Sequence, residues 1–98
     1  MKLVRDKIPE IIEKNNEKPA IRIADDEEYR IELMKKLKEE TDEFVSDGDI
    51  EELVDILEVV YSIAKNKNMS IEELEEKRIK KAEEKGSFDK RLILLDKK

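Results

Sequence analysis

Two long runs of helical periodicity, joined by a short turn at residues 46–49, constrain this fold more than any other feature. The first run starts at Asp25 or Asp26, which suit the N-cap position of a helix, and it ends at Gly48. The second run is far more apolar, since only two charged residues occur between 53 and 64. Because the connection is so short, the two helices are expected to be antiparallel neighbours. The sequence therefore predicts an all-α fold based on an antiparallel helical pair.

Weaker signals flank this pair. Residues 7–16 fit a short helix, and residues 18–24 read as an extended connection. A third helix is predicted within Ser70–Gly86, whose first residues form an S-x-x-E capping box. The closing stretch RLILL, residues 91–95, is expected to be extended or packed on the core. We expect one domain that spans residues 1–98.

The second long helix carries apolar residues on two adjacent faces rather than on one stripe. Leu53 and Leu57 lie on one face, and Ile56 and Val59 lie beside them. A surface helix in a small monomer needs only one apolar stripe. We therefore expect an antiparallel helical bundle that is completed by oligomerisation, most simply as a homodimer.

The composition excludes several classes of function. The 98 residues include no cysteine and no histidine, which removes thiolate catalysis, imidazole acid–base chemistry and the usual zinc sites. Charged residues make up 49% of the chain and the net charge is −6, which does not suit a general nucleic-acid binder. No run of about 18 apolar residues and no signal peptide is evident, so we expect a cytoplasmic protein that does not bind membranes.

One carboxylate stands where the first long helix should be apolar. Each residue of an α-helix advances by about 100°, which places Leu33, Glu40 and Phe44 on one face. Glu43 lies one turn further along at the edge of this stripe, and Glu39 lies on the same flank. Because residues three apart are neighbours on a helix surface, Glu40 and Glu43 can direct their carboxylates at one point.

The second long helix repeats this acidic spacing with Glu52 and Asp55. Both acidic pairs lie near the turn, so they can face each other across the helical pair. Four carboxylates brought together repel strongly unless a positive charge lies between them. Mg²⁺, or Mn²⁺ in its place, prefers oxygen ligands. The sequence therefore predicts a metal site formed by Glu40, Glu43, Glu52 and Asp55.

Ordinary explanations exist for the same spacing. Half of the chain is charged, so acids three residues apart arise often by chance. Asp55 aligns with polar residues that fit a solvent-exposed face, and Glu52 lies in a first helical turn, where the helix dipole favours acids. Glu40 is harder to explain in this way, although a lysine could pair with it.

Basic residues supply the complementary charge. Lys81 and Lys85 in the third helix, with Arg5 and Lys7 near the start of the chain, are candidates for binding the phosphates of a substrate. Alternatively, such residues form ordinary ion pairs with glutamates three or four positions away. The chain has no glycine-rich loop of the kind that cradles phosphates.

The acidic pattern resembles that of a known superfamily. EETDE, which contains Glu39, Glu40 and Glu43, is followed by ELVD, which contains Glu52 and Asp55. Together they are similar to the EExxE…ExxD signature of the all-α NTP pyrophosphatase superfamily, which includes MazG-like proteins, dimeric dUTPases and phosphoribosyl-ATP pyrophosphohydrolases. The opening KLVRDKIPEIIEK and the closing KKAEEKGSF resemble a short, single-domain branch of MazG-like and phosphoribosyl-ATP pyrophosphohydrolase-like proteins.

The resemblance implies a helical dimer or dimer of dimers that hydrolyses a nucleotide between its α- and β-phosphates, giving the monophosphate and pyrophosphate. It implies a Mg²⁺ site at the positions of Glu40, Glu43, Glu52 and Asp55. Glu39 matches the first acid of the motif, where it would hold a second cation or orient water. The branch often has Arg and two Gly before the Phe, whereas this chain reads KGSF, and Lys85 departs from the pattern there.

The leading hypothesis is a Mg²⁺-dependent nucleotide pyrophosphohydrolase, with Glu39 and Glu40 as candidate catalytic residues. A second hypothesis is a non-catalytic helical module. Such a module would sense a nucleotide or a metal, or would dock a protein partner through the broad apolar face of residues 53–64.

Overall fold

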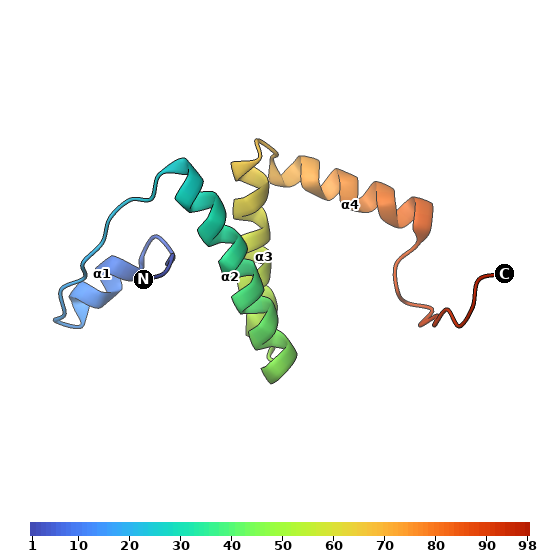
Figure 1. Ribbon diagram of the computed structural model, residues 1–98, viewed down its shortest axis with the longest axis horizontal. Coiled ribbons are helices and arrows are strands. Elements are labelled where there is room, and N and C mark those ends of the chain that lie inside the picture. Colours follow the sequence, from blue (N-terminus) through green and yellow to red (C-terminus); the bar gives the residue numbers. More distant parts are fainter.

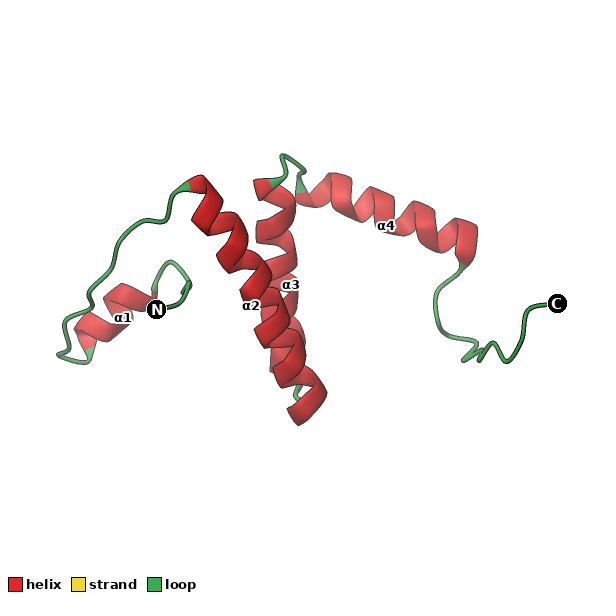
Figure 2. Cartoon of the chain, viewed as in Figure 1, coloured by secondary structure: helices red, strands yellow, loops and turns green.

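The computed structural model describes all residues from 1 to 98 and contains helices and connections but no strand (Figure 2). The helices are α1 (Ile8–Lys14), α2 (Asp26–Asp47), α3 (Ile50–Asn66) and α4 (Ile71–Lys85). The prediction of an all-α fold is confirmed. None of these helices has both the length and the apolar character that crossing a membrane requires.

Helices α2 and α3 form an antiparallel pair at the centre of the molecule (Figure 1). The carboxylate of Asp25 caps α2 by accepting a hydrogen bond from the backbone N–H of Glu28, at 2.9 Å. Gly48 ends α2 at a φ of 69°, a left-handed conformation that glycine adopts without steric cost. The carboxylate of Asp49 then caps α3. The local signals in the sequence therefore fix both the length of the turn and the register of the pair.

Helix α4 leaves the far end of α3 and extends away from the central pair (Figure 1). Ser70 and Glu73 form the predicted capping box at its start, and the connection from α3 includes Asn68 at a φ of 63°. Helix α4 packs only against α3 and has no contact with α2. Its second half therefore projects as an arm.

The opening of the chain forms a second arm on the other side of the pair (Figure 1). Helix α1 is short, starts at Lys7 without a side-chain cap, and has a proline in its first turn, where proline is tolerated. It packs on no other helix. Residues 18–24 lead back to α2 as an irregular connection, in agreement with the expected extended segment.

The hydrophobic core of a single chain is very small. Only Leu33, Val59 and Ala64 are buried apolar residues, and Glu40 is the one buried charged residue. The accessible surface is 9141 Å², whereas a compact monomer of this mass exposes about 5,800 Å². The radius of gyration is 17.8 Å, against about 13 Å for a compact chain of similar length. One copy thus leaves roughly 3,300 Å² of surface that a compact fold would bury.

The two apolar faces of α3 differ in what covers them. The face with Val59 is buried at the contact with α2. The face with Leu53, Val54 and Leu57 stays largely exposed. Packing of this face by a second copy, as the oligomer requires, remains a prediction.

The stretch after α4 adopts neither helix nor strand. Leu92, Ile93, Leu94 and Leu95 expose between 79 and 92% of their surface. Of the two expectations for this segment, packing on the core of the same chain is wrong, because the α4 arm carries it away from α2 and α3 (Figure 1). An irregular, exposed segment is what the structure has.

Candidate functional site

Glu40 lies on the face of α2 that packs against α3. Only 7% of its surface is exposed, on a helix whose other buried residue is Leu33. The Nζ atom of Lys36 lies 3.5 Å from Oε1 of Glu40 and 3.8 Å from Oε1 of Glu39. The predicted position of Glu40 in the apolar stripe is therefore confirmed, and the lysine that offsets its charge comes from one turn earlier in the same helix.

Three carboxylates from the two helices converge beside this residue. One oxygen each of Glu40, Glu43 and Glu52 lies within 4.8 Å of the other two. Glu40 and Glu43 come from neighbouring positions of α2, and Glu52 comes from the first turn of α3, directly after the Asp49 cap. The cluster thus sits at the turn end of the helical pair, as its residue positions predict.

Glu52 is the most strongly perturbed member of the cluster. Partial burial, together with the nearby carboxylates of Glu43 and then Glu40, raises the pKa of Glu52 to about 7. Its Oε2 atom is buried and has no hydrogen-bond partner. A buried polar atom without a partner is unusual in a native structure. Lys36 offsets the charge of Glu40, whereas this oxygen of Glu52 remains open to a cation or a hydrogen-bond donor.

Asp55 does not join these three carboxylates. Its Oδ1 atom accepts a hydrogen bond of 2.7 Å from Nη2 of Arg5, which lies 50 residues earlier in the chain. Two predicted site residues, one a metal ligand and the other a phosphate-binding group, are therefore paired with each other. Because Asp55 is one helical turn after Glu52, the pair places a guanidinium group beside the acidic cluster.

The remaining candidates lie outside the cluster. Glu39 is exposed and shares Lys36 with Glu40. Lys7 is at the start of α1, and Lys81 and Lys85 are exposed on the α4 arm, which points away from the cluster (Figure 1). Within one chain, these three lysines do not line the site.

Two contacts of the site go beyond the residues named from the sequence. A lysine partner for Glu40 was one of the alternatives, and the structure identifies it as Lys36, four residues earlier, the spacing at which a lysine and a glutamate meet on a helix. The pairing of Arg5 with Asp55 joins an irregular segment to a helix 50 residues away. No local pattern predicts such a contact.

A scan against models of protein families finds no match, and searches of curated proteins and of solved structures find none either. The likeness of EETDE and ELVD to the NTP pyrophosphatase signature therefore rests on the sequence motif alone. The chain itself shows an acidic cluster between two helices, with one unpartnered oxygen and one arginine close by.

Proposed function

We propose that this chain is a Mg²⁺-dependent nucleoside triphosphate pyrophosphohydrolase, which cleaves a nucleotide into its monophosphate and pyrophosphate. The observation that carries the proposal is the convergence of Glu40, Glu43 and Glu52, with the Oε2 atom of Glu52 left without a partner. The resemblance of the surrounding motif to the EExxE…ExxD signature supplies the reaction class.

The cluster suits a hard divalent cation. Its donors are all carboxylate oxygens, the ligands that Mg²⁺ and Mn²⁺ prefer. Ligands at about 2.1 Å from a Mg²⁺ ion lie at most roughly 4.2 Å apart. The oxygens of Glu40, Glu43 and Glu52 lie within 4.8 Å of one another, so small side-chain rotations bring them into range. The carboxylate of Asp55 becomes a fourth metal ligand if its ion pair with Arg5 opens.

A divalent cation held there would neutralise phosphate charge and lower the pKa of a nearby water. In the reaction, water adds to the nucleotide, the bond between the α- and β-phosphates breaks, and pyrophosphate leaves. The proton released by the water needs an acceptor. Glu39 is exposed next to the cluster, and Lys36 holds it beside Glu40, so Glu39 is the candidate acceptor.

Among the four predicted phosphate-binding residues, Arg5 is the best placed to contact the phosphates. Its guanidinium lies on Asp55, one helical turn from the cluster, and guanidinium groups bind phosphate oxygens in bidentate fashion. Lys7, Lys81 and Lys85 complete the proposed phosphate contacts only if the arms are arranged differently in an assembly. We include a homodimer or a dimer of dimers in the proposal, because one chain leaves roughly 3,300 Å² more surface than a compact monomer.

The test is to incubate the protein with Mg²⁺ and a panel of nucleotides and to measure pyrophosphate release. Glu40→Gln and Asp55→Asn should each strongly reduce the rate. Asp42→Asn is the matched control, because Asp42 is an exposed acid on α2 that pairs with Lys38 outside the cluster. Pyrophosphate release that both site variants leave unchanged would contradict the site, and no release from any nucleotide would contradict the activity.

The exposed apolar face of α3, with Leu53, Val54 and Leu57, favours a second candidate. It is a non-catalytic module that senses a nucleotide or a metal, or that docks a protein partner. Calorimetry separates the candidates. Nucleotide binding without turnover favours the sensor, and binding of neither nucleotide nor Mg²⁺ favours the docking module.

A further inference from the structure

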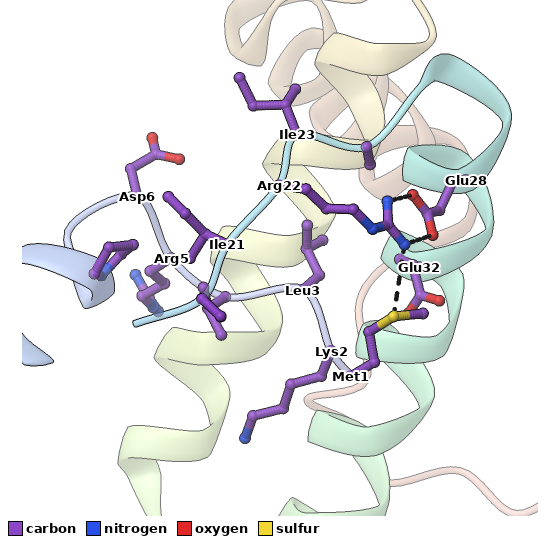
Figure 3. A pocket seen from close by; sticks show the side chains of 14 residues that line it. Met1, Lys2, Leu3, Arg5, Asp6, Ile21, Arg22, Ile23, Glu28 and Glu32 are labelled. Carbon is purple, nitrogen blue, oxygen red and sulfur yellow. Dashed lines mark hydrogen bonds and ion pairs between the residues drawn. The ribbon is translucent and has the colours of Figure 1, made fainter. Parts of the chain in front are cut away.

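A cleft of about 630 Å³ lies under the opening arm, away from the acidic cluster. Its walls come from residues 1–6, residues 20–24 and the first turns of α2 (Figure 3). Figure 3 shows the two irregular segments crossing beside α2, with Arg22 reaching across to Glu28 of that helix. Half of the lining residues are hydrophobic. The cleft therefore has a mixed apolar and charged lining, and most of its walls are backbone that belongs to no helix.

The backbone at the edge of this cleft is unpaired. No N–H or C=O group of residues 18–24 takes part in a backbone–backbone hydrogen bond. Ile21 and Ile23 alternate with smaller or charged residues, and Ile23 exposes 95% of its surface. An extended segment with free backbone groups and alternating β-branched residues is a template for pairing with another strand.

The stretch after α4 complements residues 20–24 in its free backbone groups, its apolar side chains and its charge. Residues 92–98 likewise make no backbone–backbone hydrogen bond, and the four consecutive apolar residues 92–95 are exposed. Lys90, Arg91, Lys97 and Lys98 flank them on both sides, whereas four consecutive acids, residues 25–28, follow the segment 20–24. The two segments thus match in backbone, in apolar content and in charge.

The two segments of one chain lie on opposite sides of the central pair (Figure 1). The molecule extends 61 Å along its longest axis. The connection before α4, in which the N–H of Met69 donates to the carbonyl of Ala64, directs the arm outward. A second copy can bring its own arm to the cleft without any change at this joint. The excess of roughly 3,300 Å² per chain exceeds the roughly 1,000–2,500 Å² per partner of obligate homodimers.

We propose that residues 92–95 of a second copy pair as a β-strand with residues 20–24 and place apolar side chains in the cleft. The exchange is reciprocal, so that two copies close into a symmetric dimer and each covers the exposed segment of the other. The contact uses neither the acidic cluster nor a nucleotide, and it shares with the proposed chemistry only Arg5, which lines the cleft.

Cross-linking tests the contact directly, because the chain has no native cysteine. Ile23→Cys and Ile93→Cys are purified separately, mixed, and treated with a short bis-maleimide cross-linker. The expected product is a two-chain species that is several-fold more abundant in the mixture than with either variant alone. Val45→Cys mixed with Ile93→Cys is the matched control, because Val45 is exposed on α2 near the turn and outside the cleft. Equal yields in the two mixtures would overturn the proposal.

The same substitutions placed in one chain distinguish exchange from folding back. In Ile23→Cys/Ile93→Cys, the proposal expects covalent dimers, whereas a cross-linked monomer at low protein concentration would show that each arm covers its own cleft. Deletion of residues 92–98 should raise the dissociation constant of the dimer, measured by light scattering over a dilution series, at least about tenfold. It should leave the helical circular dichroism unchanged. Lys77→Gln/Lys80→Gln, at exposed positions of α4 outside the contact, serves as its control and should leave the dissociation constant unchanged. A dissociation constant that the deletion leaves unchanged would also overturn the proposal.

Discussion

The central pair and the two arms of this molecule contain similar apolar residues, but only the pair buries any of them. In α2 and α3, caps, turn and apolar phase all agree, and the pair buries Leu33 and Val59. In the arms, equally apolar residues such as Ile23 and Leu94 are exposed. The difference indicates that the pair is specified by local sequence, whereas the apolar residues of the arms need a surface that one chain does not provide.

The largest expected effect concerns Glu40, the one charge buried within the pair. Glu40→Leu should lower kcat/KM for the nucleotide by at least about 100-fold, because it removes a proposed metal ligand. In metal-free buffer it should also raise the free energy of unfolding by about 1–2 kcal/mol, since a buried charge is replaced by an apolar side chain. Urea unfolding and a pyrophosphate assay measure the two effects.

Asp42→Leu is the control for this prediction, because Asp42 is an exposed position of the same helix. It should neither stabilise the pair nor abolish activity. A Glu40→Leu variant that keeps its activity, or that is less stable than the parent, would contradict the idea that the buried charge serves metal binding rather than folding.

The next effect contrasts one leucine from each region. Leu33→Ala should cost about 3 kcal/mol of unfolding free energy, because Leu33 is buried between the helices. Leu94→Ala should change it by less than about 0.5 kcal/mol at protein concentrations low enough to keep the chain monomeric. Equal losses in dilute chemical denaturation would show that the arm packs within one chain.

A smaller effect contrasts the two glycines, both of which have positive φ values. Gly48→Ala should cost about 1 kcal/mol, since an L side chain is strained in the left-handed turn that joins α2 and α3. Gly86→Ala should leave global unfolding unchanged, because the end of α4 packs on nothing and can fray. Hydrogen exchange of α4 amides would detect the local change, and a global loss from Gly86→Ala would contradict the comparison.

The smallest expected effect is a pH dependence within the pair. The pKa of Glu52 is raised to about 7 from its ordinary value of 4.5, so between these values the folded state binds more protons than the unfolded state. Stability therefore falls as pH rises through this window. In metal-free buffer, the midpoint of thermal unfolding should drift downward from pH 5 to pH 8, and Glu52→Gln should flatten that drift. A midpoint that rises over the same range would contradict the repulsion within the cluster.

Much of the α2–α3 pair could be predicted from the sequence, because the residues that set its ends and its packing face act on neighbouring residues. Asp25, Gly48 and Asp49 each act on neighbouring backbone groups, and the phase of Glu40 follows from helical geometry. The convergence of three carboxylates follows in turn from the short connection. These features require no knowledge of distant parts of the chain.

The rest depends on long-range arrangement. Arg5 reaches Asp55 across 50 residues through an irregular segment, and nothing near either residue encodes that contact. The positions of Lys81 and Lys85 depend on the angle at which α4 leaves α3, which a short connection with few contacts sets. The predicted packing of residues 91–95 on the core was wrong because it assumed that their apolar character is satisfied within one chain.

The location of the acidic cluster at the turn end of α2 and α3 has a consequence for the lifetime of the protein in a cell. Repulsion among Glu40, Glu43 and Glu52 acts where the two helices are joined, so an empty cluster favours opening of the hairpin near Gly48. A bound cation would hold the same point closed and hide the glutamyl peptide bonds around it from proteases. Proteases would then degrade the copies without a bound cation first. The concentration of divalent cation would therefore set the amount of protein in the cell.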